Sequence, residues 1–177
     1  RCSGSGRRLG GCPRLTASRL PARGRVLALD VGDRRIGVAV CDPFRLIATP
    51  LTVIHRAGLE RDREAVRLCA LQQEAVAVVV GLPLLPSGDR GEQAVKVETF
   101  VADVVSQLGL PVVTWDESYT TLEAERLRRE RPGRSSGRRS RIGIDAEAAA
   151  VILEEWLRAE DESRAARSSP SAQDEAT

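Results

Sequence analysis

Short apolar runs alternate with longer amphipathic segments over residues 25–158, and this pattern predicts the order of strands and helices. The first two runs flank the turn-forming segment Gly32-Asp33-Arg34-Arg35, so we expect a hairpin there. Pro50 interrupts the third run, which favours an edge strand because proline cannot donate to a β-ladder. The predicted strands are residues 25–30, 36–41, 47–54, 75–80 and 112–115, and the predicted helices are residues 59–73, 93–108, 121–131 and 145–158.

Three strands in a row, followed by alternating helix and strand, predict an α/β fold. Its mixed sheet should be antiparallel at the front, parallel at the back and covered by helices. We expect one folded domain over residues 25–160, because 177 residues suffice for one domain of ordinary size. Residues 1–24 and 161–177 lack an apolar period and are predicted to be disordered. Since residues 1–24 are rich in arginine and serine and contain no acid, an organellar transit peptide is the alternative interpretation of that segment.

Composition excludes several kinds of chemistry. The single histidine, His55, rules out His-rich zinc sites and leaves any histidine-dependent catalytic triad to that one residue. The four cysteines form no C-x-x-C pair, so we expect a reducing compartment, the cytoplasm, and no disulfide framework. No window approaches the ~18 to 20 uncharged apolar residues of a membrane span, so no membrane partner is expected. Aromatic residues make up 3% of the chain, which argues against recognition of bases by stacked rings. The candidates for chemistry are therefore the carboxylates.

The formal net charge of +2 conceals an uneven distribution. Residues 126–141 contain eight arginines against Glu130 as the one acid. Lys96 is the one lysine among the 27 basic residues, so codon composition can explain the preference for arginine. It does not explain why eight arginines crowd one short segment. We interpret this segment as a functional basic loop that suits a polyanionic partner.

Acids lie at two places where the predicted strands end. Asp30 closes an otherwise apolar strand, where an ionised carboxylate is costly unless it meets a cation or several donors. Asp116 and Glu117 follow the last strand at its carboxyl end, where ligands of open α/β sheets bind. Because side chains alternate along a strand, one of these two acids should face the site, and the pattern alone prefers neither. The alternative is that Asp30 is a turn residue and that the other two cap the next helix.

A further acid, Asp145, begins the last predicted helix and belongs to its apolar stripe. The partly positive helix N-terminus would favour a charged carboxylate there, although an ordinary N-cap would also have this residue type. The stripe that should pack on the sheet consists of Asp145, Ala148, Ala149, Ile152 and Trp156.

Taken together, these acids suggest a metal site. Carboxylates that converge repel one another by roughly 4 kcal/mol per close pair at an intermediate dielectric, and a divalent cation between them relieves this repulsion. Oxygen ligands without nearby histidine or cysteine favour Mg²⁺ or Mn²⁺. A site of this kind activates water and stabilises the leaving oxygen of a phosphodiester.

Four ordered motifs give the chain a family resemblance. They are Leu-Ala-Leu-Asp30-Val-Gly-x-x-Arg-Ile-Gly-Val-Ala-Val40, Val80-Gly-Leu-Pro-Leu84 with Gly88, Asp116-Glu117-x-x-Thr-Thr and Asp145-x-x-Ala-Ala-x-x-Ile-Leu153. Over residues 25–158 the chain resembles the YqgF/RuvX family, whose members are named as pre-16S rRNA nucleases or Holliday junction resolvases. The resemblance implies an RNase H-like fold, a five-stranded mixed sheet with flanking helices. It also implies that Asp30, Glu117 and Asp145 are the catalytic metal ligands.

The chain departs from the family pattern in two places. Ser118 stands where the family usually has an arginine after the Asp-Glu pair, which removes a cation close to the predicted metal site. The segment before Asp145, often lysine-containing in the family, contains Arg138, Arg139 and Arg141 here and keeps its charge.

From the residues and the resemblance together we expect a hydrolase acting on ester bonds. Its predicted reaction is the metal-dependent trimming of pre-16S rRNA at its 5′ end during ribosome biogenesis. Structured RNA and ribosomal precursor particles are the expected partners, and the chain is expected to be a monomer or a weak homodimer. The residues predicted to bind nucleic acid are Thr120, Thr121, Arg134, Arg138, Arg139 and Arg141.

Three alternatives remain open at this stage. A Holliday junction resolvase would use the same chemistry on branched DNA and would act as a dimer. A non-catalytic RNA-binding module in ribosome assembly or transcription would keep the fold without needing a metal. An ATPase or sugar kinase of the actin-like superfamily also has Asp-x-Gly after an apolar strand, but it needs two such domains and this chain has room for one.

Overall fold

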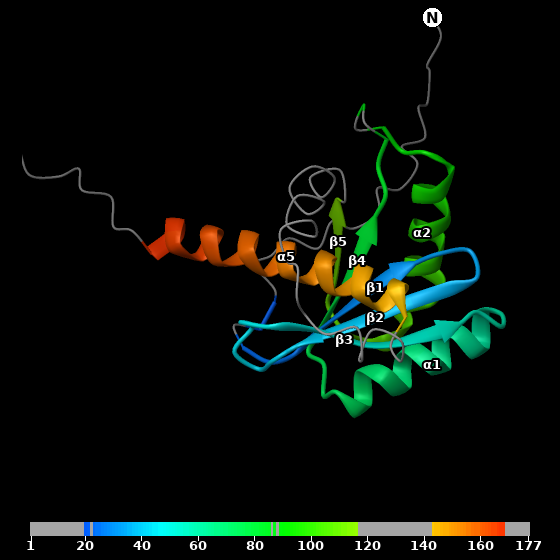
Figure 1. The fold of residues 1–177 in the computed structure, drawn as a ribbon, viewed down its shortest axis with the longest axis horizontal. Helices are drawn as coiled ribbons and strands as arrows, with labels where there is room; N and C mark the ends of the chain where they lie inside the picture. The colour runs from blue at the N-terminus through cyan, green and yellow to red at the C-terminus, as the bar shows by residue number, and fades with distance from the viewer. Residues whose placement is uncertain (1–19, 22, 86, 88, 117–142, 169–177) are drawn as a thin grey trace, which may run out of the picture.

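A five-stranded mixed sheet forms the centre of the computed structural model, which describes residues 20–21, 23–85, 87, 89–116 and 143–168 (Figure 1). The strand order is β3-β2-β1-β4-β5. The strands are β1 (Val26–Val31), β2 (Arg35–Cys41), β3 (Ala48–His55), β4 (Ala77–Leu82) and β5 (Val112–Asp116). The helices of the described part are α1 (Leu59–Gln72), α2 (Glu92–Asp103), the 3₁₀ helix η2 (Val105–Leu108) and α5 (Ile144–Ser168).

The pairing of the strands confirms the predicted mixed sheet. β2 pairs antiparallel with both β1 and β3, whereas β4 pairs parallel with both β1 and β5. The predicted hairpin is present, and its turn is closed by a hydrogen bond from the Gly32 amide to the Arg35 carbonyl (2.9 Å). Pro50 lies in β3 at the sheet edge as expected, next to a register shift at Val38 and Ala39.

Both faces of the sheet are covered, and the alternation of side chains along β1 shows why. Leu27 and Leu29 pack into the core on the side of α1 and α2, whereas Val26 and Ala28 pack into the core under α5. Figure 1 shows α5 lying across the opposite face of the sheet from α1 and α2. The stripe predicted for the last helix is confirmed, because Ala149, Ile152 and Trp156 of α5 are buried against the sheet.

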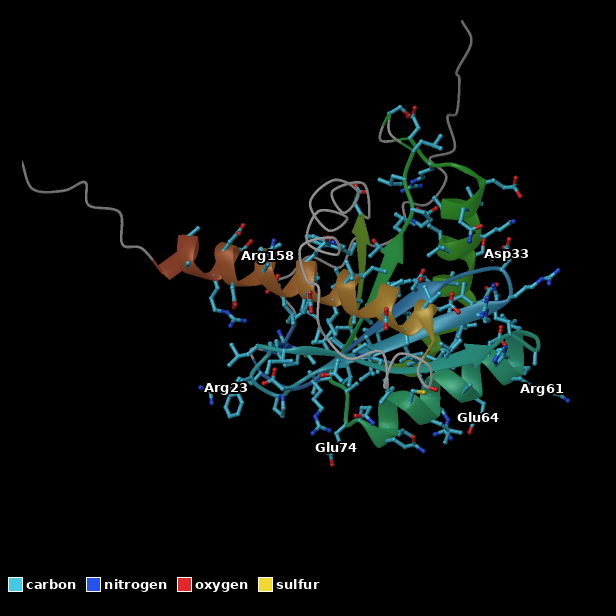
Figure 2. The ribbon with its side chains drawn as sticks, viewed as in Figure 1. Arg23, Asp33, Arg61, Glu64, Glu74 and Arg158 are labelled. Atoms are coloured by element: carbon cyan, nitrogen blue, oxygen red, sulfur yellow. The ribbon has the colours of Figure 1, made fainter. Side chains whose placement is uncertain are left out.

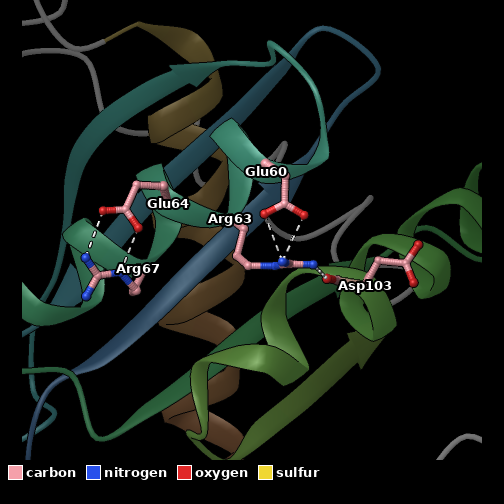
Figure 3. Close-up of polar contacts among 5 residues, drawn as sticks. All are labelled: Glu60, Arg63, Glu64, Arg67 and Asp103. Carbon is pink, nitrogen blue, oxygen red and sulfur yellow. Dashed lines mark hydrogen bonds and ion pairs between the residues drawn. The ribbon is translucent and has the colours of Figure 1, made fainter.

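Polar contacts link α1 to the end of α2 on the far face. The Arg63 guanidinium donates to a carboxylate oxygen of Glu60 (3.0 Å) and to the backbone carbonyl of Asp103 (2.8 Å) (Figure 3). One turn further along α1, Arg67 pairs with Glu64 in solvent at 2.8 Å (Figure 3). The bond from Arg63 to Asp103 joins the two helices at the surface, above an apolar core, whereas the pair of Arg67 and Glu64 lies within α1.

The predicted helix over residues 93–108 is wrong in its last five residues. α2 ends at Asp103, Val104 adopts φ −114° and ψ −62°, and a 3₁₀ turn follows up to Gly109, which has a left-handed φ of 70°. Val104 and Val105 are adjacent and both fully buried. An α-helix would also place both on its apolar face, so the apolar pattern does not distinguish an α-helix from a 3₁₀ turn at this point.

The predicted end of the last helix, at Arg158, is also wrong, because α5 continues to Ser168. Residues 161–168 therefore form helix where disorder was expected, and residues 161–166 are exposed. Their Glu, Arg and Ala residues favour helix without needing burial, and Asp161 and Arg164 form an i,i+3 ion pair at 3.9 Å. Apolar periodicity cannot detect a helical turn that buries nothing.

The last residues of the predicted N-terminal disordered segment also belong to the folded domain. Leu20 packs against the core under α5. Arg45, which is buried in the loop between β2 and β3, donates to the carbonyls of Pro21 (2.6 Å) and Gly24 (3.1 Å). The predicted helix over 121–131 and residues 169–177 lie outside the described residues. Within the described part, none of the helices has the length and apolar character needed to cross a bilayer.

Candidate active site

Asp30 is a polar residue near the end of a strand whose other residues are buried. It is half-buried, and it stands in register with Gly37 of β2 on one side, while β4 runs parallel on the other. Burial raises the pKa of the Asp30 carboxyl group, and the negative charge of Asp145 raises it further. The two acids that the sequence singled out at residues 30 and 145 are therefore electrostatic neighbours.

Gly37 explains how Asp145 comes to lie there. A Cβ atom at position 37 would overlap the backbone carbonyl group of Asp145 and crowd the amide of Ala146. Because glycine has no side chain, the first turn of α5 rests directly on β2, beside the strand that carries Asp30. A glycine within an apolar strand signals such a close approach, although the sequence does not say which segment approaches.

The two carboxylates open into a recess of about 180 Å³. Arg35 provides a cation on one side of it, with its Nε 3.2 Å from Oδ2 of Asp145. Arg34 is exposed, and among the described residues its side chain has no acidic partner. The residues that line the recess are Asp30, Gly32, Asp33, Arg34, Arg35 and Asp145.

A buried ion pair holds the turn that forms one wall of this recess. Arg56 donates through Nη1 to the carbonyl of Gly32 (3.1 Å) and through Nε to Oδ2 of Asp62 (3.0 Å). Asp62 is 1% exposed, and its other oxygen accepts from the amide of Ala57 (2.9 Å). The Arg56 guanidinium also lies 5.0 Å from the ring centroid of Phe100 in α2.

Helix α2 holds the same turn from a second direction. Gln93 donates to the carbonyl of Val31 (3.3 Å), and Lys96 pairs with Asp33 (3.4 Å) at the tip of the turn. Figure 2 shows Asp33 on this turn, close to α2. Sequence reasoning missed Arg56 and Gln93, because nothing in their local pattern indicates which backbone carbonyl each one reaches.

The structure therefore brings together Asp30 and Asp145 of the three predicted acids. β1, β4 and β5 are parallel, so their carboxyl ends share one edge of the sheet. Val113 and Trp115 share one face of β5 and pack on the side of α5, in keeping with the alternation of side chains along a strand. The following residues lie outside the described part of the chain: Glu117, Thr120, Thr121, Arg134, Arg138, Arg139 and Arg141.

The donor set fits a hard divalent cation. Two carboxylates share one recess, and burial and then the charge of Asp145 raise the pKa of Asp30, so a cation between them would relieve the repulsion. Arg35 offsets the charge of Asp145 in part. The described residues contain no group of three or more His, Cys, Asp or Glu side chains placed to hold a metal, and the third predicted ligand, Glu117, lies beyond them.

Comparisons with known proteins show the family and agree with the fold. The family model of RuvX, described as Holliday junction resolvase, matches residues 24–159. A protein of Roseiflexus sp. (strain RS-1) named "Putative pre-16S rRNA nuclease" is 41% identical over 76% of this chain and 94% of its own length. A protein of Synechococcus sp. (strain JA-3-3Ab) with the same name is 43% identical over 81% of this chain and 87% of its own length.

Among solved structures, T. thermophilus RuvC in complex with a Holliday junction substrate matches with a TM-score of 0.52 at 20% identity. The match covers 78% of this chain and 96% of that one. This likeness confirms the predicted RNase H-like fold, and the relatives confirm the predicted class, a nuclease that hydrolyses phosphodiester bonds of nucleic acid. Within that class, the chain belongs to the RuvX family, as its motifs indicated.

Proposed function

We propose that the protein is a metal-dependent endonuclease that trims pre-16S rRNA at its 5′ end during ribosome biogenesis. The observation that carries this proposal is the meeting of Asp30 and Asp145 in one recess at the carboxyl end of β1. That arrangement occurs in a chain whose relatives, at 38–44% identity, bear the name of pre-16S rRNA nuclease. Ribosomal precursor particles are then the expected partners.

Asp30 and Asp145 would hold the cation, with Glu117 as the third ligand. An all-oxygen donor set favours Mg²⁺ or Mn²⁺. The chemistry that such a cation supplies when bound is activation of water and stabilisation of the leaving oxygen. The raised pKa of Asp30 means that its ionised form is unfavourable in the metal-free protein. A bound cation would stabilise this ionised form, so the site should attract a cation.

The arginines of the recess supply the positive charge that a nucleic-acid backbone needs. Arg34 is exposed on the rim, has no described acidic partner and can contact a phosphate there. Ser118 replaces the arginine of the family pattern in this chain, and Arg34 would supply a cation near the site instead. Phosphate contacts position the substrate without selecting a base sequence, so further binding strength should come from Arg134, Arg138, Arg139 and Arg141.

Cleavage of a pre-16S rRNA fragment with an extended 5′ end tests this function. Asp30→Asn should lower the rate at least about 100-fold, the upper end of what loss of an outer-shell partner costs a metal site. Asp33→Asn is the matched control, because Asp33 lines the same recess but its carboxylate pairs with Lys96. An unchanged rate in Asp30→Asn refutes the proposal.

The description of the matching family favours one second candidate, a Holliday junction resolvase. The same preparation should therefore be offered a synthetic four-way DNA junction. Paired symmetric nicks in the junction, with the RNA left intact, would favour the resolvase. If neither substrate is cut and RNA is still bound, the non-catalytic RNA-binding module becomes the better hypothesis, and calorimetry with Mn²⁺ then shows whether the metal site exists.

A further inference from the structure

Two carboxylates that share a recess need a counter-charge, and Arg35 provides one. Its Nε lies 3.2 Å from Oδ2 of Asp145. The pair is partly open to solvent, with the Arg35 side chain 56% exposed and that of Asp145 31% exposed. The contact is therefore an accessible ion pair in which both partners can exchange with solvent or with another ion.

Arg35 compensates one of the two acids and not both. Among the described residues, the ion pair of Arg35 is with Asp145, and none joins Arg35 to Asp30. A divalent cation placed between the carboxylates would reach both of them. A cation held by both carboxylates would therefore compete with Arg35 for the negative charge of Asp145.

The attachment of Arg35 is loose in comparison with that of Arg56. Asp145 is the acidic partner of the Arg35 guanidinium among the described residues. Arg56 instead contacts a backbone carbonyl, a buried carboxylate and an aromatic ring, and its side chain is 28% exposed. Release of Arg35 would break one solvent-exposed contact, whereas release of Arg56 would leave a buried charge behind.

We propose that Arg35 is an exchangeable counter-ion of the metal site. It holds Asp145 in the metal-free protein and gives up this carboxylate when a divalent cation binds. Arg35 thus stabilises the metal-free fold and lowers the affinity for the cation. This inference rests on the proposed function, because it assumes that Asp30 and Asp145 are metal ligands.

Calorimetric titration with Mn²⁺ tests the exchange, with metal-free melting temperatures as a second measurement. Arg35→Gln should bind Mn²⁺ several-fold more tightly than the wild type and should melt at a lower temperature without metal. Arg34→Gln is the matched control: it removes one positive charge from the same recess without breaking an ion pair, so it measures the general effect of charge. Arg35→Lys keeps a competing cation and should stay close to the wild type.

An Asp145→Asn background isolates the proposed competition. There the Arg35 substitution should change Mn²⁺ affinity no more than the Arg34 substitution does, because the contested carboxylate is gone. Equal or weaker binding of Mn²⁺ by Arg35→Gln in the otherwise wild-type protein would overturn the inference, and weaker binding would identify Arg35 as a residue that positions Asp145. Failure of the wild type itself to bind Mn²⁺ is a different result, since it overturns the metal site and the proposed function together.

Discussion

Gly37 of β2 lies against the backbone carbonyl of Asp145, so closely that a Cβ atom on residue 37 would occupy the same space. These residues are more than 100 positions apart in the chain, and their contact seats the first turn of α5 beside Asp30. The absence of one methyl group therefore decides where a predicted metal ligand stands.

Gly37→Ala should move the start of α5 away from β2 and disable the site. We expect a loss of about 1 to 3 kcal/mol in the free energy of unfolding, the usual cost of overpacking, together with a larger loss of cleavage than stability alone explains. Denaturant unfolding and the rate on the RNA fragment measure the two effects. Gly91→Ala is the control, because the added methyl there meets the flexible Leu85 side chain at 3.3 Å. Equal effects of the two substitutions would contradict this account.

Arg56→Gln should destabilise the protein, because it leaves Asp62 buried without its cation. The expected loss in unfolding free energy is up to about 3 kcal/mol, the lower end for a buried pair, since Arg56 is 28% exposed. A second substitution, Asp62→Asn, should recover part of this loss by removing the stranded charge. Arg67→Gln breaks the exposed pair with Glu64 and should change stability little (Figure 3). Thermal unfolding of the wild type, Arg56→Gln, the double variant and Arg67→Gln measures these differences in stability.

The metal-free protein should depend on pH in a way that identifies Asp30. Because its folded pKa is raised, the folded state binds the proton more tightly than the unfolded state. Stability should therefore fall as pH rises from the ordinary value of 3.8 through the raised pKa. Asp30→Asn should remove this loss and melt at a higher temperature than the wild type at pH 7 without metal.

Asp42 offers a control of opposite sign. Burial acts to raise its pKa, but three backbone amides, those of Ile47, Leu46 and Phe44, donate to its carboxylate and leave the pKa lowered. The ionised Asp42 carboxylate therefore stabilises the folded protein above its ordinary pKa, and this stabilisation is lost as pH falls. At pH 7, Asp42→Asn should melt at a lower temperature than the wild type. Melting curves of both variants between pH 4 and pH 7 would contradict the assignment if Asp30→Asn behaved like Asp42→Asn.

The basic segment should account for much of the salt dependence of RNA binding. If four of its arginines, Arg134, Arg138, Arg139 and Arg141, each contact a phosphate, their replacement by alanine should lower the slope of log K against log salt by about 3 for single-stranded RNA. Replacement of Arg63 and Arg67 on α1 should leave the slope near the wild-type value, because both are paired with glutamates (Figure 3). Fluorescence polarisation across a salt series measures the slopes. Equal slopes in all three proteins would assign RNA binding to another surface.

The predicted acids show which site residues can be identified from the sequence pattern alone. Asp30 and Asp145 stood out because each is an acid on an otherwise apolar strand or stripe, and the structure places both in one recess. The pattern did not reveal Arg56, which donates a hydrogen bond to the carbonyl of Gly32, a residue distant in the chain. It also misplaced the ends of α2 and α5, since an apolar stripe does not distinguish an α-helix from a 3₁₀ turn and an exposed helix shows no apolar period.

The amino-acid sequence by itself determined the order of strands and helices, the hairpin, the edge position of β3 and the family. The elements follow from the periodic spacing of apolar residues, because the buried positions of a helix or strand recur at fixed intervals. The family follows from the order of the motifs. Tertiary structure alone decided that Asp145 lies against Gly37 and that Arg35 pairs with Asp145. It also decided that Arg56 holds the neighbouring turn. Those contacts join distant segments through the shapes of single side chains, and no local periodicity encodes which partners will meet.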